Sequence, residues 1–61
     1  MKRRDLLRRI EREGAVFVRE GSNHTVYRNS HTGKSIAIPR HREIDEELAA
    51  AMIRVAQRRQ S

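Results

Sequence analysis

The chain has 61 residues and no cysteine, so its fold must be held together by side-chain packing alone. A chain of this length buries only about 60% of the surface that it exposes when unfolded. Hydrophobic residues make up 36% of the sequence, with Phe17 and Tyr27 as its two aromatic residues, and we expect both in a thin core of Leu, Ile, Val and Ala. We therefore expect one domain spanning residues 1–61, with no deep cleft and no cofactor.

The charge of the chain points to a polyanionic partner. Fourteen Lys and Arg residues stand against eight Asp and Glu residues, which gives a net charge of +6. Only Lys2 and Lys34 are lysines, and the arginine fork matches phosphate and stacks on bases, which favours RNA or DNA. An acidic protein or an anionic membrane surface would suit the same charge balance, and charge alone does not choose between these partners.

The sequence contains no segment typical of secretion or of membrane insertion. The first ten residues alternate cations with apolar side chains, and the longest apolar stretch, Leu48–Ile53, is too short to span a bilayer. We expect a soluble cytoplasmic protein that makes no membrane contact.

The N-terminal segment has the pattern of an amphipathic helix. Leu6, Leu7 and Ile10 recur at helical spacing among cations, and Gly14 stands where a helix C-cap is wanted. These features predict a helix over Arg4–Glu13.

Three short segments with strand character follow this helix. Turn-forming residues separate them at 20–23 and 29–33, and Pro39 closes the last one. The predicted strands, which form an antiparallel meander, are Ala15–Val18, His24–Arg28 and Lys34–Ile38.

A second amphipathic helix is predicted over Asp45–Arg58. Asp45 is a suitable N-cap and two glutamates follow it at the positive end of the helix dipole. Its apolar stripe is expected to comprise Leu48, Ala51, Met52, Val55 and Ala56. The order α-β-β-β-α predicts an α+β fold in which both helices cover one face of a three-stranded antiparallel sheet.

The other face of the sheet is then open. Alternation along the second strand separates Thr25 and Tyr27 from His24, Val26 and Arg28. Tyr27 is the better core residue, which places His24 and Arg28 on the open face. A one-residue bulge would reverse this assignment.

The chain resembles the HicA family, the toxins of HicA–HicB toxin–antitoxin pairs. The resemblance covers nearly the whole chain, and the element Gly21-Ser22-Asn23-His24 with the downstream Pro39-Arg40-His41 carries it. It implies a fold like that of a double-stranded RNA-binding domain and a ribosome-independent endoribonuclease that cleaves mRNA. It also implies inhibition by a HicB-type antitoxin, in an assembly that could be a heterotetramer.

The resemblance implies that His24 is the catalytic histidine and that Gly21, Ser22 and Asn23 form the turn that presents it. Imidazole exchanges protons near neutral pH, and RNA carries its own nucleophile in the 2′-OH. The amides of Gly21 or Ser22 are candidates to stabilise the charged transition state. Further candidates are basic residues expected to bind RNA, namely Arg28, Lys34 and Arg40, and candidates for a second acid are Tyr27, His31 and His41.

Simpler interpretations stand beside these. A histidine in a polar turn is often only solvated, Ser22 most simply serves its own turn, and the dispersed histidines indicate no metal site. At least one arginine of the first helix could contact phosphate, from the set Arg3, Arg4, Arg8, Arg9 and Arg12. The alternative functions are a non-catalytic double-stranded RNA-binding module, disfavoured by the acidic start of the second helix, and a protein that binds only an acidic partner.

Overall fold

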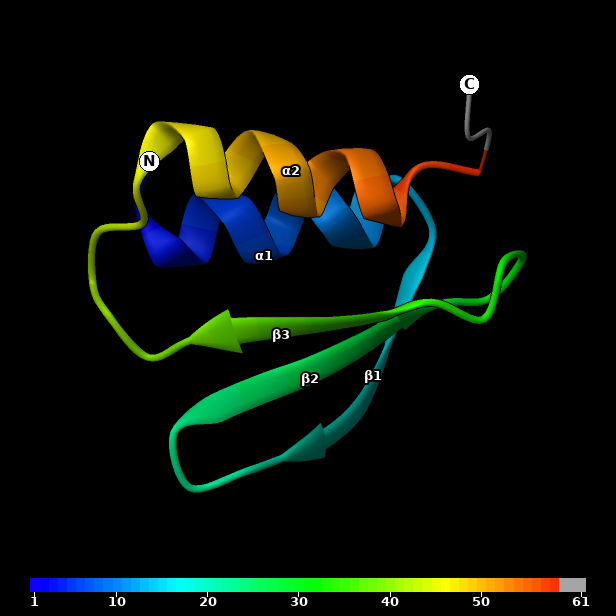
Figure 1. The fold of residues 1–61 in the computed structure, drawn as a ribbon, viewed down its shortest axis with the longest axis horizontal. Helices are drawn as coiled ribbons and strands as arrows, with labels where there is room; N and C mark the ends of the chain where they lie inside the picture. The colour runs from blue at the N-terminus through cyan, green and yellow to red at the C-terminus, as the bar shows by residue number, and fades with distance from the viewer. Residues whose placement is uncertain (59–61) are drawn as a thin grey trace.

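The computed structural model describes residues 1–58 and contains five elements in the order α-β-β-β-α. They are α1 (Arg3–Arg12), β1 (Ala15–Glu20), β2 (His24–Asn29), β3 (Ser35–Pro39) and α2 (Glu46–Ala56). Figure 1 shows the two helices side by side over one face of the sheet. The predicted α+β fold is confirmed, with boundaries that shift by one or two residues at most ends.

The first helix forms for the reasons that its sequence suggests. Leu6 and Ile10 lie one turn apart and are fully buried, while cations occupy the outer surface. Gly14 has a φ of 109°, a conformation that glycine adopts without steric cost, and its amide donates to the Glu11 carbonyl at 3.0 Å. This turn ends α1 and directs the chain into β1.

The sheet is an antiparallel meander in the order β1-β2-β3. His24 pairs with Pro39 on β3, and Thr25 and Tyr27 are buried whereas His24 and Arg28 are exposed. The predicted division of β2 into a core face and an open face is therefore confirmed. A bulge does occur, but it lies in β1 between Phe17 and Arg19 and leaves the alternation of β2 intact.

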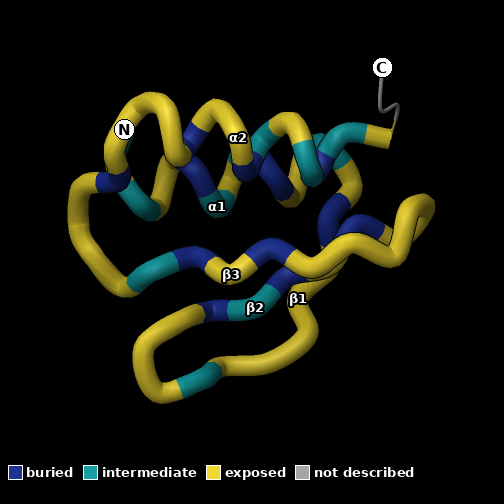
Figure 2. The backbone as a smooth tube through the Cα atoms, in the orientation of Figure 1, coloured by how far each residue is buried: buried dark blue, intermediate teal, exposed yellow. Residues whose placement is uncertain are grey.

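Phe17 is not in the core, contrary to the expectation from its type. It pairs with Tyr27 and their rings meet edge to face at a centroid distance of 5.8 Å, yet Phe17 remains 57% exposed. β1 runs away from the helices as it leaves Ala15 (Figure 1), and the exposed colouring of its outer part in Figure 2 follows from this. No helix covers Phe17, so its ring shields only one side of Tyr27.

The second helix begins as predicted, and its buried face agrees with the predicted stripe in part. The Asp45 carboxylate accepts hydrogen bonds from the amides of Glu47 and Leu48, as an N-cap does. Ile44, just before the cap, is buried in the core together with Ala49, in the arrangement of a hydrophobic staple. The buried face is Ala49, Met52 and Ala56, whereas Leu48 is 44% exposed.

The stripe prediction was right at Met52 and Ala56 but wrong at Leu48 and Ala51, which are exposed. Alanine at positions 49 and 56 lies on the buried face with Met52, and the larger Leu48 lies beside that face in partial contact with solvent. Within residues 1–58, no helix has the length and apolar content that crossing a membrane requires.

Tyr27 provides a spectroscopic test of the packing. Its hydroxyl donates to the Glu11 carboxylate, and burial together with this bond raises the pKa of Tyr27 to about 12. Tyr27 is the single tyrosine and the chain has no tryptophan, so the ultraviolet absorbance of tyrosinate reports on this residue alone. We expect a midpoint near 12 in the folded protein and near the ordinary value of about 10 in denaturant.

The same shift fixes the sign of the pH dependence. Tyr27 keeps its proton longer when folded, so its contribution to stability is complete below pH 10 and is lost as the pH rises toward 12. The Tyr27→Phe variant should lose less stability than the wild type across this window. A folded-state midpoint near 10 would contradict the buried, carboxylate-bonded hydroxyl.

Candidate functional site

A tight turn presents His24 at one end of the sheet. The Gly21 amide donates to the His24 carbonyl at 2.7 Å, which closes the turn between β1 and β2. A Cβ atom at Gly21 would lie 3.2 Å from that same carbonyl oxygen, so the close approach favours glycine here. Ser22, Asn23 and His24 are all exposed. The turn therefore fixes the backbone of His24 and leaves its imidazole accessible to a ligand.

Arg40, which directly follows β3, also contacts this turn. Its guanidinium donates to the Gly21 carbonyl at 2.9 Å and pairs with the Glu20 carboxylate. Both side chains of this ion pair are about half exposed, so Arg40 keeps donors toward solvent. Of the predicted RNA-binding residues, Arg40 is the one that the structure brings to the turn carrying His24.

The other two predicted basic residues lie elsewhere. Arg28 shares the open face with His24 but is four residues further along β2, or about 13 Å at the usual rise of about 3.3 Å per residue. Lys34 precedes β3 and lies in the connection at the opposite end of the sheet, where its amide donates to the Thr32 hydroxyl. The strand assignment of Lys34 was wrong by one residue.

The backbone amides that the sequence suggested for charge stabilisation differ in availability. The Gly21 amide is already bonded to His24, so it has no free donor, and that candidate was wrong. The Ser22 amide has no hydrogen-bond partner within residues 1–58 and lies in an exposed turn. The Ser22 amide can therefore donate to an anion.

The three candidates for a second acid are separated by the fold. Tyr27 faces the helices, and its raised pKa makes it a poor proton donor near neutral pH. His31 lies at the far end of the sheet, where its Nε2 accepts from the Nε of Arg58 at 3.0 Å. His41 directly follows Arg40 and is exposed. His41 is the candidate that lies at the same end of the molecule as His24.

Sequence reasoning missed the tie that Arg3 makes between α1 and this end of the sheet. Its Nε donates to the Pro39 carbonyl at 3.0 Å and its terminal nitrogen to the Thr25 hydroxyl. Pro39 pairs with His24, and Thr25 is the residue after His24. Arg3 therefore binds both strands of the pair that carries the imidazole. The only sequence signal was the run of cations that opens α1.

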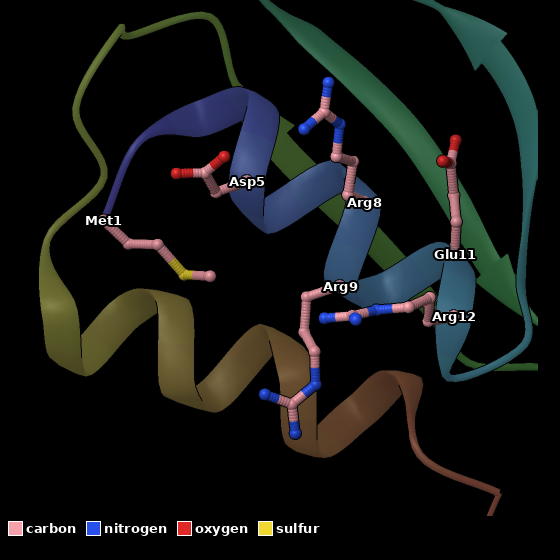
Figure 3. A pocket seen from close by; sticks show the side chains of 6 residues that line it. All are labelled: Met1, Asp5, Arg8, Arg9, Glu11 and Arg12. Carbon is pink, nitrogen blue, oxygen red and sulfur yellow. The ribbon is translucent and has the colours of Figure 1, made fainter.

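Charged side chains line two hollows on the surface of residues 1–58. One lies on α1, where Figure 3 shows acidic and basic side chains interspersed; its lining is Met1, Asp5, Arg8, Arg9, Glu11 and Arg12. The other lies between the start of α1 and the connection from β3 to α2, and it is strongly basic. Within residues 1–58, no group of three side chains is placed to hold a metal ion.

The fold and the site define a small basic α+β protein that presents an accessible histidine on a polar turn beside arginine. The family comparison gives this class a name: a family model described as the HicA toxin of bacterial toxin–antitoxin systems matches residues 3–57. The chain belongs to the HicA toxin family. A toxin role and a cognate antitoxin follow from this membership. Neither the curated proteins nor the solved structures yielded a match.

Proposed function

We propose that this protein is an endoribonuclease toxin that cleaves mRNA in the cytoplasm without the ribosome, and that His24 moves the proton in the reaction. The observation that carries the proposal is the exposed imidazole on a turn whose backbone is fixed by Gly21 and Arg40. Membership of a toxin family supports it, because a ribonuclease toxin needs little more than a positioned proton carrier beside an RNA-binding surface.

The reaction uses the nucleophile that RNA supplies. The 2′-oxygen attacks the adjacent phosphorus, the bond from phosphorus to the 5′-oxygen breaks, and the products are a 2′,3′-cyclic phosphate and a 5′-hydroxyl. One proton leaves the 2′-OH and one reaches the 5′-oxygen, so the step needs no co-reactant. His24 takes the first proton as a base or gives the second as an acid, and both roles lead to the same products.

Negative charge builds on the phosphate oxygens as the 2′-oxygen attacks. The free Ser22 amide and the solvent-facing donors of Arg40 are the groups near His24 that can stabilise this charge. His41, which follows Arg40 and is exposed, is the candidate for the second proton carrier. The turn residues Gly21, Ser22 and Asn23 thus serve as the frame of the site.

The proposal includes a HicB-type antitoxin as the physiological inhibitor, in a complex that we expect to be a heterotetramer. The net charge of +6 favours an acidic partner. A non-catalytic double-stranded RNA-binding module is the weaker alternative, because α2 begins with the Asp45 cap and two glutamates, which repel phosphate.

The product ends test the mechanism. Incubation of the purified protein with a synthetic single-stranded RNA should give fragments that end in a 2′,3′-cyclic phosphate and begin with a 5′-hydroxyl, as mass spectrometry distinguishes. The same RNA with 2′-O-methyl riboses should resist cleavage, since its 2′-oxygen cannot lose a proton. Fragments with 5′-phosphates would rule out attack by the 2′-oxygen, and binding without cleavage would favour the module.

A further inference from the structure

A strongly basic concave surface lies outside the turn that carries His24. This hollow of about 860 Å³, here termed the basic groove, is formed by the start of α1 and the connection that follows β3. It is lined by Lys2, Arg3, Arg4, Arg40, Arg42 and Glu43. Five of these six residues are cations drawn from two segments almost forty positions apart in the sequence.

The two walls of the basic groove are joined by backbone hydrogen bonds. The Arg3 amide donates to the Arg42 carbonyl at 2.9 Å, and Lys2 forms an isolated antiparallel bridge with Glu43. The Ile44 amide donates to the Met1 carbonyl at 2.7 Å, and Ile44 is itself buried in the core. The cations are therefore gathered by a fixed backbone, and a ligand need not bring the two walls together.

Three of these cations have no partner for their charge. Lys2, Arg4 and Arg42 are exposed, and their side chains make no ion pair or hydrogen bond within residues 1–58. The hollow on α1 differs, because Asp5 and Glu11 lie among its arginines (Figure 3). Uncompensated like charges held together repel one another, so an anion bound between them relieves that repulsion.

The basic groove is continuous with the candidate active site. Arg40 lines the groove and donates to the Gly21 carbonyl, while Arg3 lines it and donates to Pro39, the partner of His24. In Figure 1 the start of α1, the connection after β3 and the turn between β1 and β2 all lie at the same end of the molecule. A strand of nucleic acid placed at His24 can thus extend into the groove.

We propose that the basic groove binds the backbone phosphates of RNA that flank the cleaved bond, an inference that rests on the proposed ribonuclease function. The lining favours a nucleic-acid backbone over a protein, because it contains no aromatic or aliphatic residue that could form the apolar centre of a protein interface. Arginine forks bind phosphate oxygens bidentately, and they need no particular base. The groove therefore supplies affinity without sequence preference.

The test measures binding separately from cleavage. The probe is a fluorescent single-stranded RNA twelve nucleotides long with 2′-O-methyl riboses, titrated by anisotropy over a range of salt concentrations. The double variant Arg4→Gln/Arg42→Gln should bind more weakly, and its plot of log K against log salt should be shallower by about 1.4, at about 0.7 per lost phosphate contact. The matched control Arg8→Gln/Arg12→Gln makes the same charge change on the other hollow and should keep the wild-type slope.

Each remaining outcome decides between the groove and its alternatives. Equal losses in both double variants would mean diffuse attraction by net charge, and unchanged binding in the groove variant would also overturn the proposal. Loss of affinity for an acidic antitoxin with RNA affinity intact would assign the groove to the protein partner instead.

In cleavage of long RNA, the groove variant should raise KM and leave kcat unchanged. Failure of the wild type to cleave would sink the ribonuclease function, whereas binding of the methylated probe tests the groove regardless.

Discussion

The His24→Ala variant should bind RNA nearly as well as the wild type and cleave it about 10²- to 10⁴-fold more slowly, the usual contribution of one general acid or base. The imidazole is exposed, and the turn is closed by the His24 carbonyl, which alanine retains. The substitution therefore removes the proton carrier without disturbing the backbone. Initial cleavage rates on a purified transcript measure the effect, and growth after induction of each variant measures its consequence in cells.

His31→Ala is the matched control for this experiment. It removes the same side chain at the opposite end of the sheet, where the ring accepts a hydrogen bond from Arg58 in an exposed position. We expect wild-type cleavage and growth arrest from this variant. Wild-type cleavage by His24→Ala, at an unchanged melting temperature, would remove His24 from the mechanism. Equal loss of activity in both variants would mean that the effect does not depend on the position of His24, which would contradict its proposed role.

Local patterns predicted most of the fold because each acts through neighbours in the sequence. The spacing of Leu6 and Ile10 specifies a buried helix face, Gly14 supplies the conformation that ends the helix, and alternation along β2 separates Tyr27 from His24. The presenting turn was predictable in the same way, since Gly21 to Asn23 lack any competing preference for helix or strand. These elements need no knowledge of distant contacts.

The errors arose where a second element decides the outcome. Phe17 has the correct type for a core but lies on an edge strand that leaves the cover of the helices. Leu48 belongs to an apolar stripe, yet α2 buries the smaller Ala49 and leaves Leu48 exposed. Neither the reach of a helix over a sheet nor the preference for small side chains at a contact is encoded in the local pattern.

The basic groove was hidden for a related reason. The sequence showed cations before Leu6 and again after Pro39, but the two groups come together only in the folded chain, through backbone contacts such as the bridge of Lys2 with Glu43. A charge cluster formed from segments so far apart has no periodicity that a single sequence reveals. Arg40 was the one member of the groove singled out near the site, because it follows the strand that pairs with His24.

Asn29 is the residue whose role in stability was least visible in the sequence, and Asn29→Ala should lower the free energy of unfolding by about 3 kcal/mol. The sequence placed Asn29 in a turn, but it is the last residue of β2, it is 99% buried, and its side-chain amide nitrogen donates to the carbonyls of Val55 and Gln57, each at 2.8 Å. The side-chain oxygen of Asn29 accepts from the backbone amides of His31 and Thr32 at 2.8 and 3.1 Å. One side chain thus joins the turn after β2 to the end of α2.

The loss is large because alanine removes four hydrogen bonds that the Asn29 side chain makes with backbone groups of a small protein. A domain of this length is stable by roughly 3–9 kcal/mol, so the substitution removes a third of that stability or more. At about 4–8 °C per kcal/mol, thermal unfolding followed by circular dichroism should show a melting temperature lower by more than about 10 °C. Asn23→Ala, the same change in the exposed turn before β2, should stay within about 0.5 kcal/mol of the wild type. If the two variants melt together, the Asn29 side chain does not clamp the turn to α2, and the closure of the sheet against the helix rests on apolar packing alone.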